Sequence, residues 1–407
     1  MQAAVQMKWS AVQGHIVTGG GELVACTAEG RDFHNEELPH YHLQMRSTRK
    51  QFEAWLQDPR CKSDLLCGCW SRPVFAGGWL HDSESMTEAF NLQTPSLFID
   101  MRFPVDRPTE QLRRAGSVEA CTDEELMQLA QQHCFAGYSL PSEGVQGGLD
   151  ADKPHFTRHH IIDWNFHPRF PRPRPNKWWV QVSPDGQSFK EFSFARNALS
   201  LPVYFEQWRR REGDSGGLKY FAARREVGCP VKAAARGREP ESDGLFIIMG
   251  NHFAFTKDRA QPVPDFSFAS VSGPAGPALV DQTLADRSAD SQVWERRRAC
   301  ELYLSLEGSY GLVRCPSSSS SSPATFVVSR STMPWREGQR VLPGDGAVTF
   351  LGHSAHGQGA ERGELFWAGL RFKILECSFA RQELLALFPS SSTFLSPAPS
   401  AAVKSHL

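Results

Sequence analysis

The chain has 407 residues, a formal net charge of -1 at pH 7, and a composition that is 40% hydrophobic and 11% aromatic. This length fits one large domain or two to three smaller ones, and the balanced charge gives no general attraction to nucleic acid or to an anionic membrane. No apolar run approaches the roughly 20 residues that cross a bilayer, and the first residues lack the apolar core of a secretory signal. Ten scattered cysteines are typical of a reduced intracellular chain. We therefore expect a cytoplasmic protein without a nucleic-acid partner or a membrane span.

Short apolar or alternating segments, separated by Gly and Pro, follow one another along most of the chain. Such spacing predicts a mainly β, antiparallel sandwich or barrel. We expect an N-terminal extension, partly flexible, then the main part of a barrel, then C-terminal strands that complete the barrel or pack on it, and finally a flexible tail. The four parts are predicted at residues 1–60, 61–270, 271–380 and 381–407.

Two segments interrupt this pattern with a helical one. Residues 122–134 begin with Thr122, a good N-cap, and Glu125 stands three residues later, where it completes a capping box. Leu126 and Leu129 form the start of an apolar stripe on this helix. Residues 284–299 also have a helical pattern, so we predict one or two helices packed on the β structure.

The segment LFIDMRFP, residues 97–104, places an acid and a base on an otherwise apolar strand. Because side chains alternate across a strand, Asp100 and Arg102 share one face. Arg158 lies among aromatic residues in a later strand candidate, as does Glu206 in another. A purely structural barrel interior is filled by aliphatic side chains, whereas a ligand cavity is largely apolar with a few placed polar groups. A solvent-facing surface would give the same alternation, but we expect an inward polar cluster.

The first strand candidate opens with GCW, and the pair Gly68 and Trp70 resembles the Gly-x-Trp motif of the calycins, the lipocalin-like barrels. In that group the Trp closes one end of the barrel. An ordinary core aromatic would look the same in the sequence.

Several longer segments resemble the Hri family of fungal proteins and their bacterial relatives. The most specific are LFIDMRFP at 97–104 and STMPWREG at 331–338, and FTRHHIIDW, VYFEQW and LFIIMGNHFAFTKDR stand in the family's order between them. The resemblance covers most of residues 65–375 and implies a lipocalin-like β-barrel, with no reaction that can be transferred. The chain departs from the bacterial pattern in its first 60 residues, at 165–177, in the run of serines at 317–322 and in the tail.

Three functions are open to such a barrel. The first is binding of a small apolar or aromatic acid, with its head group held by arginine, which matches a carboxylate bidentately. The residues that would bind it are Asp100, Arg102, Arg158, Tyr204, Glu206 and Trp208. The second is a cofactor-independent lyase or isomerase in which Arg102 holds the substrate, and Glu206 and Tyr204 move protons. The third is a protein-interaction module, in which internal ion pairs only fix the strand register.

Other chemistry has weaker support. No metal site is expected, because His40, His42, Cys67 and Cys69 lack the further ligands of a zinc pattern, and no cofactor motif is present. We expect Glu301 and Glu337 to join the interior network, since each lies beside aromatic or basic residues.

The last three residues, Ser405, His406 and Leu407, resemble the Ser-Lys-Leu peroxisomal address with His in place of Lys. The preceding stretch is rich in Ser, Pro and Ala, and a flexible tail is what an import receptor needs. A peroxisomal location, with the import receptor as a partner, is therefore the alternative to the cytoplasm.

Overall fold

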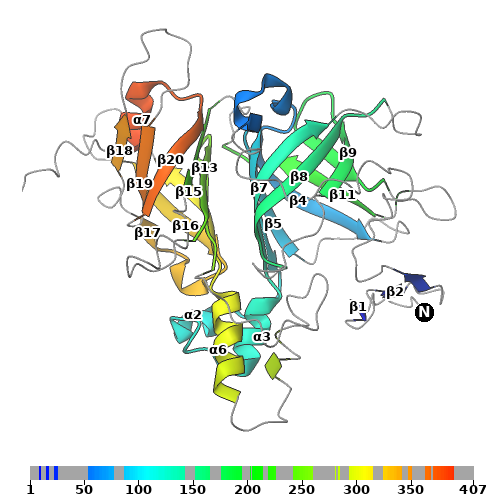
Figure 1. Ribbon diagram of the computed structural model, residues 1–407, viewed down its shortest axis with the longest axis vertical. Coiled ribbons are helices and arrows are strands. Elements are labelled where there is room, and N and C mark those ends of the chain that lie inside the picture. The colour runs from blue at the N-terminus through cyan, green and yellow to red at the C-terminus, as the bar shows by residue number, and fades with distance from the viewer. Residues whose placement is uncertain are drawn as a thin grey trace, which may run out of the picture.

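The computed structural model describes residues 9–10, 15–17, 23–25, 54–77, 87–142, 152–165, 176–194, 202, 204–213, 219–225, 242–259, 280, 283–284, 293–314, 324–341, 347–350, 363–367 and 370–388. Two β bodies stand side by side in it, with α2 (Thr109–Ala115), α3 (Asp123–Ala130) and α6 (Val293–Leu304) beneath them and α7 (Arg381–Leu387) at the opposite end, beside the second body (Figure 1).

The first body is a closed antiparallel barrel of eight strands in the order β10-β11-β4-β5-β6-β7-β8-β9. Neighbours along the chain pair with one another, and the barrel closes where β11 pairs with β4. This confirms the prediction of a mainly β fold with an antiparallel barrel. The strands are β4 Gly68–Gly77, β5 Thr87–Gln93, β6 Leu97–Pro104, β7 His133–Ser142, β8 His155–Asp163, β9 Asn176–Val182, β10 Ser188–Phe192 and β11 Tyr204–Arg210.

The second body is a nine-stranded antiparallel sheet in the order β17-β16-β15-β14-β13-β12-β20-β19-β18. This sheet contains the strands between 220 and 257, which were predicted to belong to the barrel. It also contains the strands between 307 and 377. The strands are β12 Tyr220–Arg225, β13 Gly244–Met249, β14 His252–Lys257, β15 Glu307–Arg314, β16 Thr325–Ser331, β17 Arg340–Val341, β18 Ala347–Phe350, β19 Gly363–Trp367 and β20 Leu370–Cys377.

Short elements complete the fold. Near the N-terminus, three strands form a small sheet of their own, namely β1 Trp9–Ser10, β2 His15–Val17 and β3 Leu23–Ala25. The helices are η2 Pro59–Cys61, α2 Thr109–Ala115, α3 Asp123–Ala130, α6 Val293–Leu304, η4 Pro334–Arg336 and α7 Arg381–Leu387.

The predicted capping box begins α3. The hydroxyl of Thr122 accepts from the backbone N–H of Glu125, whose carboxylate accepts from the backbone N–H of Thr122. In contrast, α7 lies in the segment predicted to be a flexible tail. Leu384 and Leu387 are buried in the apolar cluster of the large sheet, so this part of the tail is packed. None of the helices in the described part of the chain is long and apolar enough to cross a membrane.

The barrel and the sheet share one apolar core. The outward face of β6, with Leu97, Ile99, Met101 and Phe103 at most 1% exposed, belongs to the same cluster as the side chains of β13. Each such side chain contributes about 1.5–3 kcal/mol when fully buried. At Gly308 in β15, an added Cβ would lie 2.5 Å from the sulfur of Cys134. The absence of a side chain at Gly308 therefore lets the sheet approach the barrel.

Candidate functional site

The inward face of β6 carries the acid and the base that stand out in the sequence. Asp100 is the cross-strand partner of Asn91, and Arg102 is the partner of Ala89. Ala89 belongs to the interior cluster of the barrel, whereas the alternate residues of β6 pack on the sheet. Asp100 is therefore fully buried inside the barrel, and the side chain of Arg102 is 21% exposed.

Four strands contribute to one ion-pair network around these two residues. Arg102 pairs with Asp100 through two contacts, Nε to Oδ1 at 2.9 Å and Nη2 to Oδ2 at 3.2 Å. Arg158 of β8 reaches the same carboxylate, with Nη1 3.0 Å from Oδ2. Glu206 of β11 accepts from Arg72 of β4 at 2.8 Å and from Arg102 at 3.4 Å. The structure thus brings Asp100, Arg102, Arg158 and Glu206 together.

The arginines of this network also lie over aromatic rings. The guanidinium carbon of Arg158 is 4.4 Å from the ring centre of Phe98 and 4.8 Å from that of Trp178. That of Arg72 is 5.0 Å from the ring centre of Phe75. Such stacking stabilises a guanidinium where water is excluded.

The charges of the network do not balance. Burial alone would raise the pKa of Asp100, but Arg102 and Arg158 outweigh it and hold that pKa well below its usual range. Glu191 of β10 is the cross-strand partner of Glu206. Burial, and then the neighbouring charge of Glu206, raise the pKa of Glu191 to about 8. The raised pKa keeps Glu191 largely protonated at neutral pH. The guanidinium groups of Arg72, Arg102 and Arg158 therefore face the ion-paired carboxylates of Asp100 and Glu206, and the interior has an excess of positive charge.

The two remaining predicted residues lie on the same face of β11. Trp208 is fully buried, and its ring is stacked at 6.1 Å on that of Phe189. Tyr204 is half-buried at the start of the strand, where its backbone N–H donates to the hydroxyl of Ser193. Tyr204 and Trp208 therefore flank Glu206 along the strand.

Trp70 of β4 lies in the apolar cluster of the barrel, and its cross-strand partner on β5 is Asn91. Its indole N–H donates to the carbonyl oxygen of Leu66 at 2.9 Å, and the edge of Phe189 meets its ring at 4.8 Å. The guanidinium carbon of Arg210 lies 4.3 Å from the ring centre of Trp70, and the same side chain donates to the carbonyl oxygen of Cys67. Trp70 is thus held by a hydrogen bond, an aromatic contact and a cation–π contact.

Sequence reasoning missed several interior residues. Arg72 stands two residues after Trp70, and Glu191 lies in a short FKEF strand, so alternation on each strand could have found both. Asn91 and Gln93 alternate with two core residues of β5 and point inward with Ala89. Among the described residues, both side-chain atoms of each amide lack a hydrogen-bond partner.

His133, another missed residue, precedes the core residues of β7 and is the cross-strand partner of Arg102. Burial lowers its pKa to about 4, and the charges of Arg102 and Arg72 act in the same direction. The imidazole is therefore neutral at pH 7, and its ring is stacked on Phe135 at 5.8 Å. In the part of the chain that the structure describes, no group of three or more His, Cys, Asp or Glu residues could hold a metal ion.

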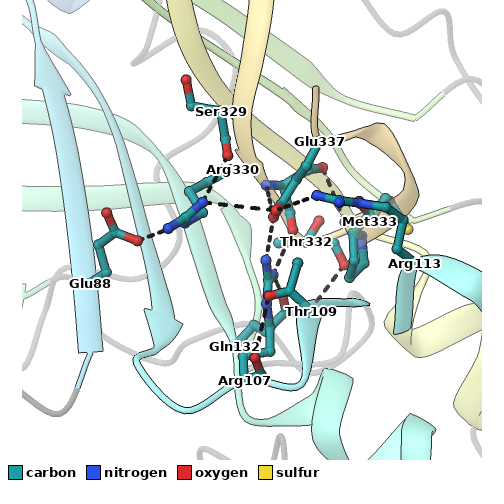
Figure 2. Close-up of polar contacts among 12 residues, drawn as sticks. Glu88, Arg107, Thr109, Arg113, Gln132, Ser329, Arg330, Thr332, Met333 and Glu337 are labelled. Atoms are coloured by element: carbon teal, nitrogen blue, oxygen red, sulfur yellow. Dashed lines mark hydrogen bonds and ion pairs between the residues drawn. The ribbon is translucent and has the colours of Figure 1, made fainter. Parts of the chain in front are cut away.

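A second buried network lies outside the barrel (Figure 2). Arg107, just after β6, pairs with Glu337, which follows η4, and also donates to Gln132 and to the carbonyl oxygen of Ser331. The prediction that Glu337 and Glu301 belong to the interior network is therefore wrong. Glu301 lies on α6, where it pairs with Arg297 and Arg298 of the preceding helical turn.

Comparisons with known proteins give one distant structural neighbour. No family model matches the chain, and a search of curated proteins found no match. The crystal structure of an uncharacterised protein, YLR301w from Saccharomyces cerevisiae, aligns with a TM-score of 0.36 and 13% sequence identity. The alignment covers 76% of this chain and 98% of the yeast chain.

Proposed function

We propose that the barrel binds a small apolar or aromatic acid, with the carboxylate of the ligand at Arg102. The observation that carries this proposal is the composition of the interior, where three arginines pair with Asp100 and Glu206 among aromatic rings. An anion that enters removes the excess positive charge. The aromatic side chains supply the apolar lining that holds the rest of a small ligand.

Unpartnered polar groups support the same function. In the described residues, one oxygen of Glu191, one oxygen of Glu206 and the indole N–H groups of Trp178 and Trp208 are buried without a hydrogen-bond partner. Each such group costs about 1–3 kcal/mol when it is left unsatisfied. A ligand that offers donors and acceptors here recovers part of this cost, so the interior is suited to recognition.

Arg102 is the arginine best placed to exchange a partner. Its side chain is the most exposed of the three, and its contact with Glu206 is the longest in the network at 3.4 Å. Asp100 keeps Arg158 if Arg102 turns to a ligand, and Glu206 keeps Arg72. The exchange therefore leaves neither carboxylate without a countercharge.

The test is native mass spectrometry of the purified full chain, followed by denaturing extraction and by titration with cinnamate and octanoate. We expect a small acid that either copurifies or binds with one-to-one stoichiometry, and no binding of the amides of the same two acids. A protein that takes up neither the acids nor any extracted compound would contradict the proposal. The interaction-module alternative, with ion pairs that only fix the register, would then account for the barrel.

Catalysis by a cofactor-independent lyase or isomerase is the second candidate, and the pKa of Glu191 favours it. A carboxyl group with a pKa of about 8 can both donate and accept a proton near neutral pH. In this scheme Arg102 holds the substrate, and Glu206 and Tyr204 flank the reacting atoms. Incubation of each bound acid with the protein, followed by product analysis, separates a catalyst from a carrier.

Membership of the Hri family, with a lipocalin-like or calycin barrel, is part of the proposal. The closed eight-stranded barrel and the burial of Trp70 support it. A crystal structure of one further chain that carries both LFIDMRFP and STMPWREG would test it, because the family requires the same strand order.

We also propose that the C-terminus is a peroxisomal address. Ser405, His406 and Leu407 lie outside the described residues, so only the sequence supports this proposal. A fluorescent reporter that carries residues 396–407 should gather in peroxisomes, and its Leu407→Ala version should stay in the cytosol. A diffuse signal from both reporters would contradict the address.

A further inference from the structure

Three uncharged polar side chains line the barrel interior beside the charged network. Asn91 and Gln93 lie on β5, Ser139 lies on β7, and β6 runs between these two strands. All three residues are 0% exposed. The hydroxyl of Ser139 and all four amide atoms lack a hydrogen-bond partner among the described residues.

The strand register shows how these side chains are arranged. Asn91 is level with Asp100, and Gln93 is level with Phe98. The backbone N–H of Ser139 donates to the carbonyl oxygen of Ser96 at 2.9 Å. At a rise of about 3.3 Å per residue, the row extends some 13 Å along β6 from the level of Asp100, away from Arg102. The row therefore starts beside the charged network and continues along the same face of β5 toward the level of Gly68 on β4.

The side chains of this row are uncharged, and each can both donate and accept a hydrogen bond. Each amide offers a donor and an acceptor, and a serine hydroxyl offers both. Buried polar side chains nearly always have a partner, so an unsatisfied row of this kind needs an explanation. Apolar side chains of the same size would pack here without the cost of unsatisfied polar atoms. Basic side chains in their place would instead favour a second anionic group.

We propose that Asn91, Gln93 and Ser139 form an uncharged recognition site for a hydroxyl or carbonyl group at the far end of the bound acid. The ligand is then a bifunctional acid, with its carboxylate at Arg102 and a neutral hydrogen-bonding group several ångströms away. This inference rests on the proposed function and narrows it to one class of ligand. A site that hydrogen-bonds a ligand hydroxyl discriminates strongly against the analogue that lacks it, because its own polar groups stay unpaired.

Calorimetric titration of the full chain with matched pairs of acids tests the inference. The pairs are 4-hydroxycinnamate with cinnamate and 8-hydroxyoctanoate with octanoate. We expect at least one hydroxy acid to bind 10-fold or more tightly than its plain partner. Equal affinities within both pairs would overturn the inference and leave the proposed function in place, whereas no binding of any of the four acids would overturn both.

Substitutions of single residues in the row test which side chains cause the preference for the hydroxy acid. Gln93→Leu and Asn91→Leu should reduce the preference for the hydroxy acid over the plain acid to about 3-fold or less, because each removes the amide that would bind the hydroxyl group. Both variants should fold, because the substitution removes an unsatisfied buried group. Gln181→Leu, on the exposed side of β9, is the matched control and should keep the full preference. A preference that survives in both inner variants would overturn the assignment, as would an ordered water that stays on these side chains in the crystal structure of the complex.

Discussion

The two buried polar networks are built from the same residue types but are satisfied to different degrees. The carboxylate of Glu337 accepts from Arg107 and from the backbone N–H of Ser331, and Arg113 lies 3.6 Å from it. Among the described residues, no side-chain nitrogen or oxygen of Arg107, Gln132 or Glu337 is buried without a hydrogen-bond partner, and their contacts are drawn in Figure 2. In the barrel, by contrast, Glu191 and Asn91 are buried with atoms that no described residue satisfies.

The difference separates a structural joint from a recognition site. Arg107 and Glu337 are far apart in the chain, and their pair ties the end of β6 to the turn after β16, so that the barrel and the sheet are joined. In such a joint, the hydrogen bonds and ion pairs all have to be formed in the folded protein itself. A site that awaits a ligand must keep some of its hydrogen-bonding capacity free, and the barrel interior has that property.

The largest expected effect concerns the joint. Arg107→Met leaves the carboxylate of Glu337 buried with its closest cation removed, and loss of one partner of a buried pair costs about 3–5 kcal/mol. We expect that loss in the free energy of urea unfolding, with affinity for a small acid unchanged in the protein that remains folded. A loss below 1 kcal/mol would show that the pair is not the joint. Arg114→Met, an exposed change on the following helix α2, is the control and should have no effect.

The second effect concerns Glu191 and depends on pH. Its pKa is about 8 in the folded protein, above the 4.5 of an ordinary Glu, so the folded state binds more protons between these values. Its contribution to stability is therefore complete below about pH 4.5 and is lost as the pH rises through 8. Glu191→Gln, which is neutral at every pH, should remove this loss, with a relative gain on the order of 2–4 kcal/mol at pH 9.

Thermal melts of the wild type and of Glu191→Gln at pH 5, 7 and 9 measure this difference. Parallel pH profiles would contradict the buried, protonated carboxyl group. Glu364→Gln in β19 is a control on a partly exposed carboxylate of the other sheet, and its profile should follow that of the wild type.

Alternation along single strands was enough to predict part of the site. LFIDMRFP places Asp100 and Arg102 on one face, and the same rule relates Glu206 to Tyr204 and Trp208. The rule cannot tell which face is inside, and that choice depended on the aromatic neighbours of the charges. The rule could have placed Arg72 on the same face as Trp70, but it does not show which strand pairs with β4, so the contact of Arg72 with Glu206 on the neighbouring strand β11 could not be predicted.

The division of the fold was harder to predict, for a physical reason. Antiparallel strands with Gly and Pro between them look alike whether they close a barrel or extend a sheet, and closure depends on the register between β4 and β11. The strands after Tyr220 therefore could not be separated from the barrel by pattern alone. Glu337 was likewise assigned to the wrong network, because a motif such as WREG shows an ion-pairing residue without showing its distant partner.

The third prediction concerns Arg102 in the barrel interior and the affinity for a small acid. Arg102→Met should weaken binding of cinnamate or octanoate about 10- to 30-fold, which corresponds to about 1.4–2 kcal/mol. The unfolding free energy should fall by less than that of Arg107→Met, because Asp100 and Glu206 each keep another arginine. Arg209→Met, exposed on β11, is the matched control for the loss of a positive charge. A steep loss of stability with unchanged affinity would favour the register role.

The smallest effect is expected at the rim of the joint, where Arg330 pairs with Glu88 at 2.7 Å. The side chain of Arg330 is 42% exposed, and exposed ion pairs of this kind contribute about 0–1 kcal/mol. Its guanidinium also lies 4.0 Å from Glu337, so Arg330→Ala removes a cation from the same carboxylate that Arg107 serves. If burial and complete hydrogen bonding make the joint strong, Arg330→Ala should cost far less than Arg107→Met in the same urea titration. Equal losses would mean that net charge around Glu337 sets the stability, and the contrast between the two networks would then have to be explained by charge alone.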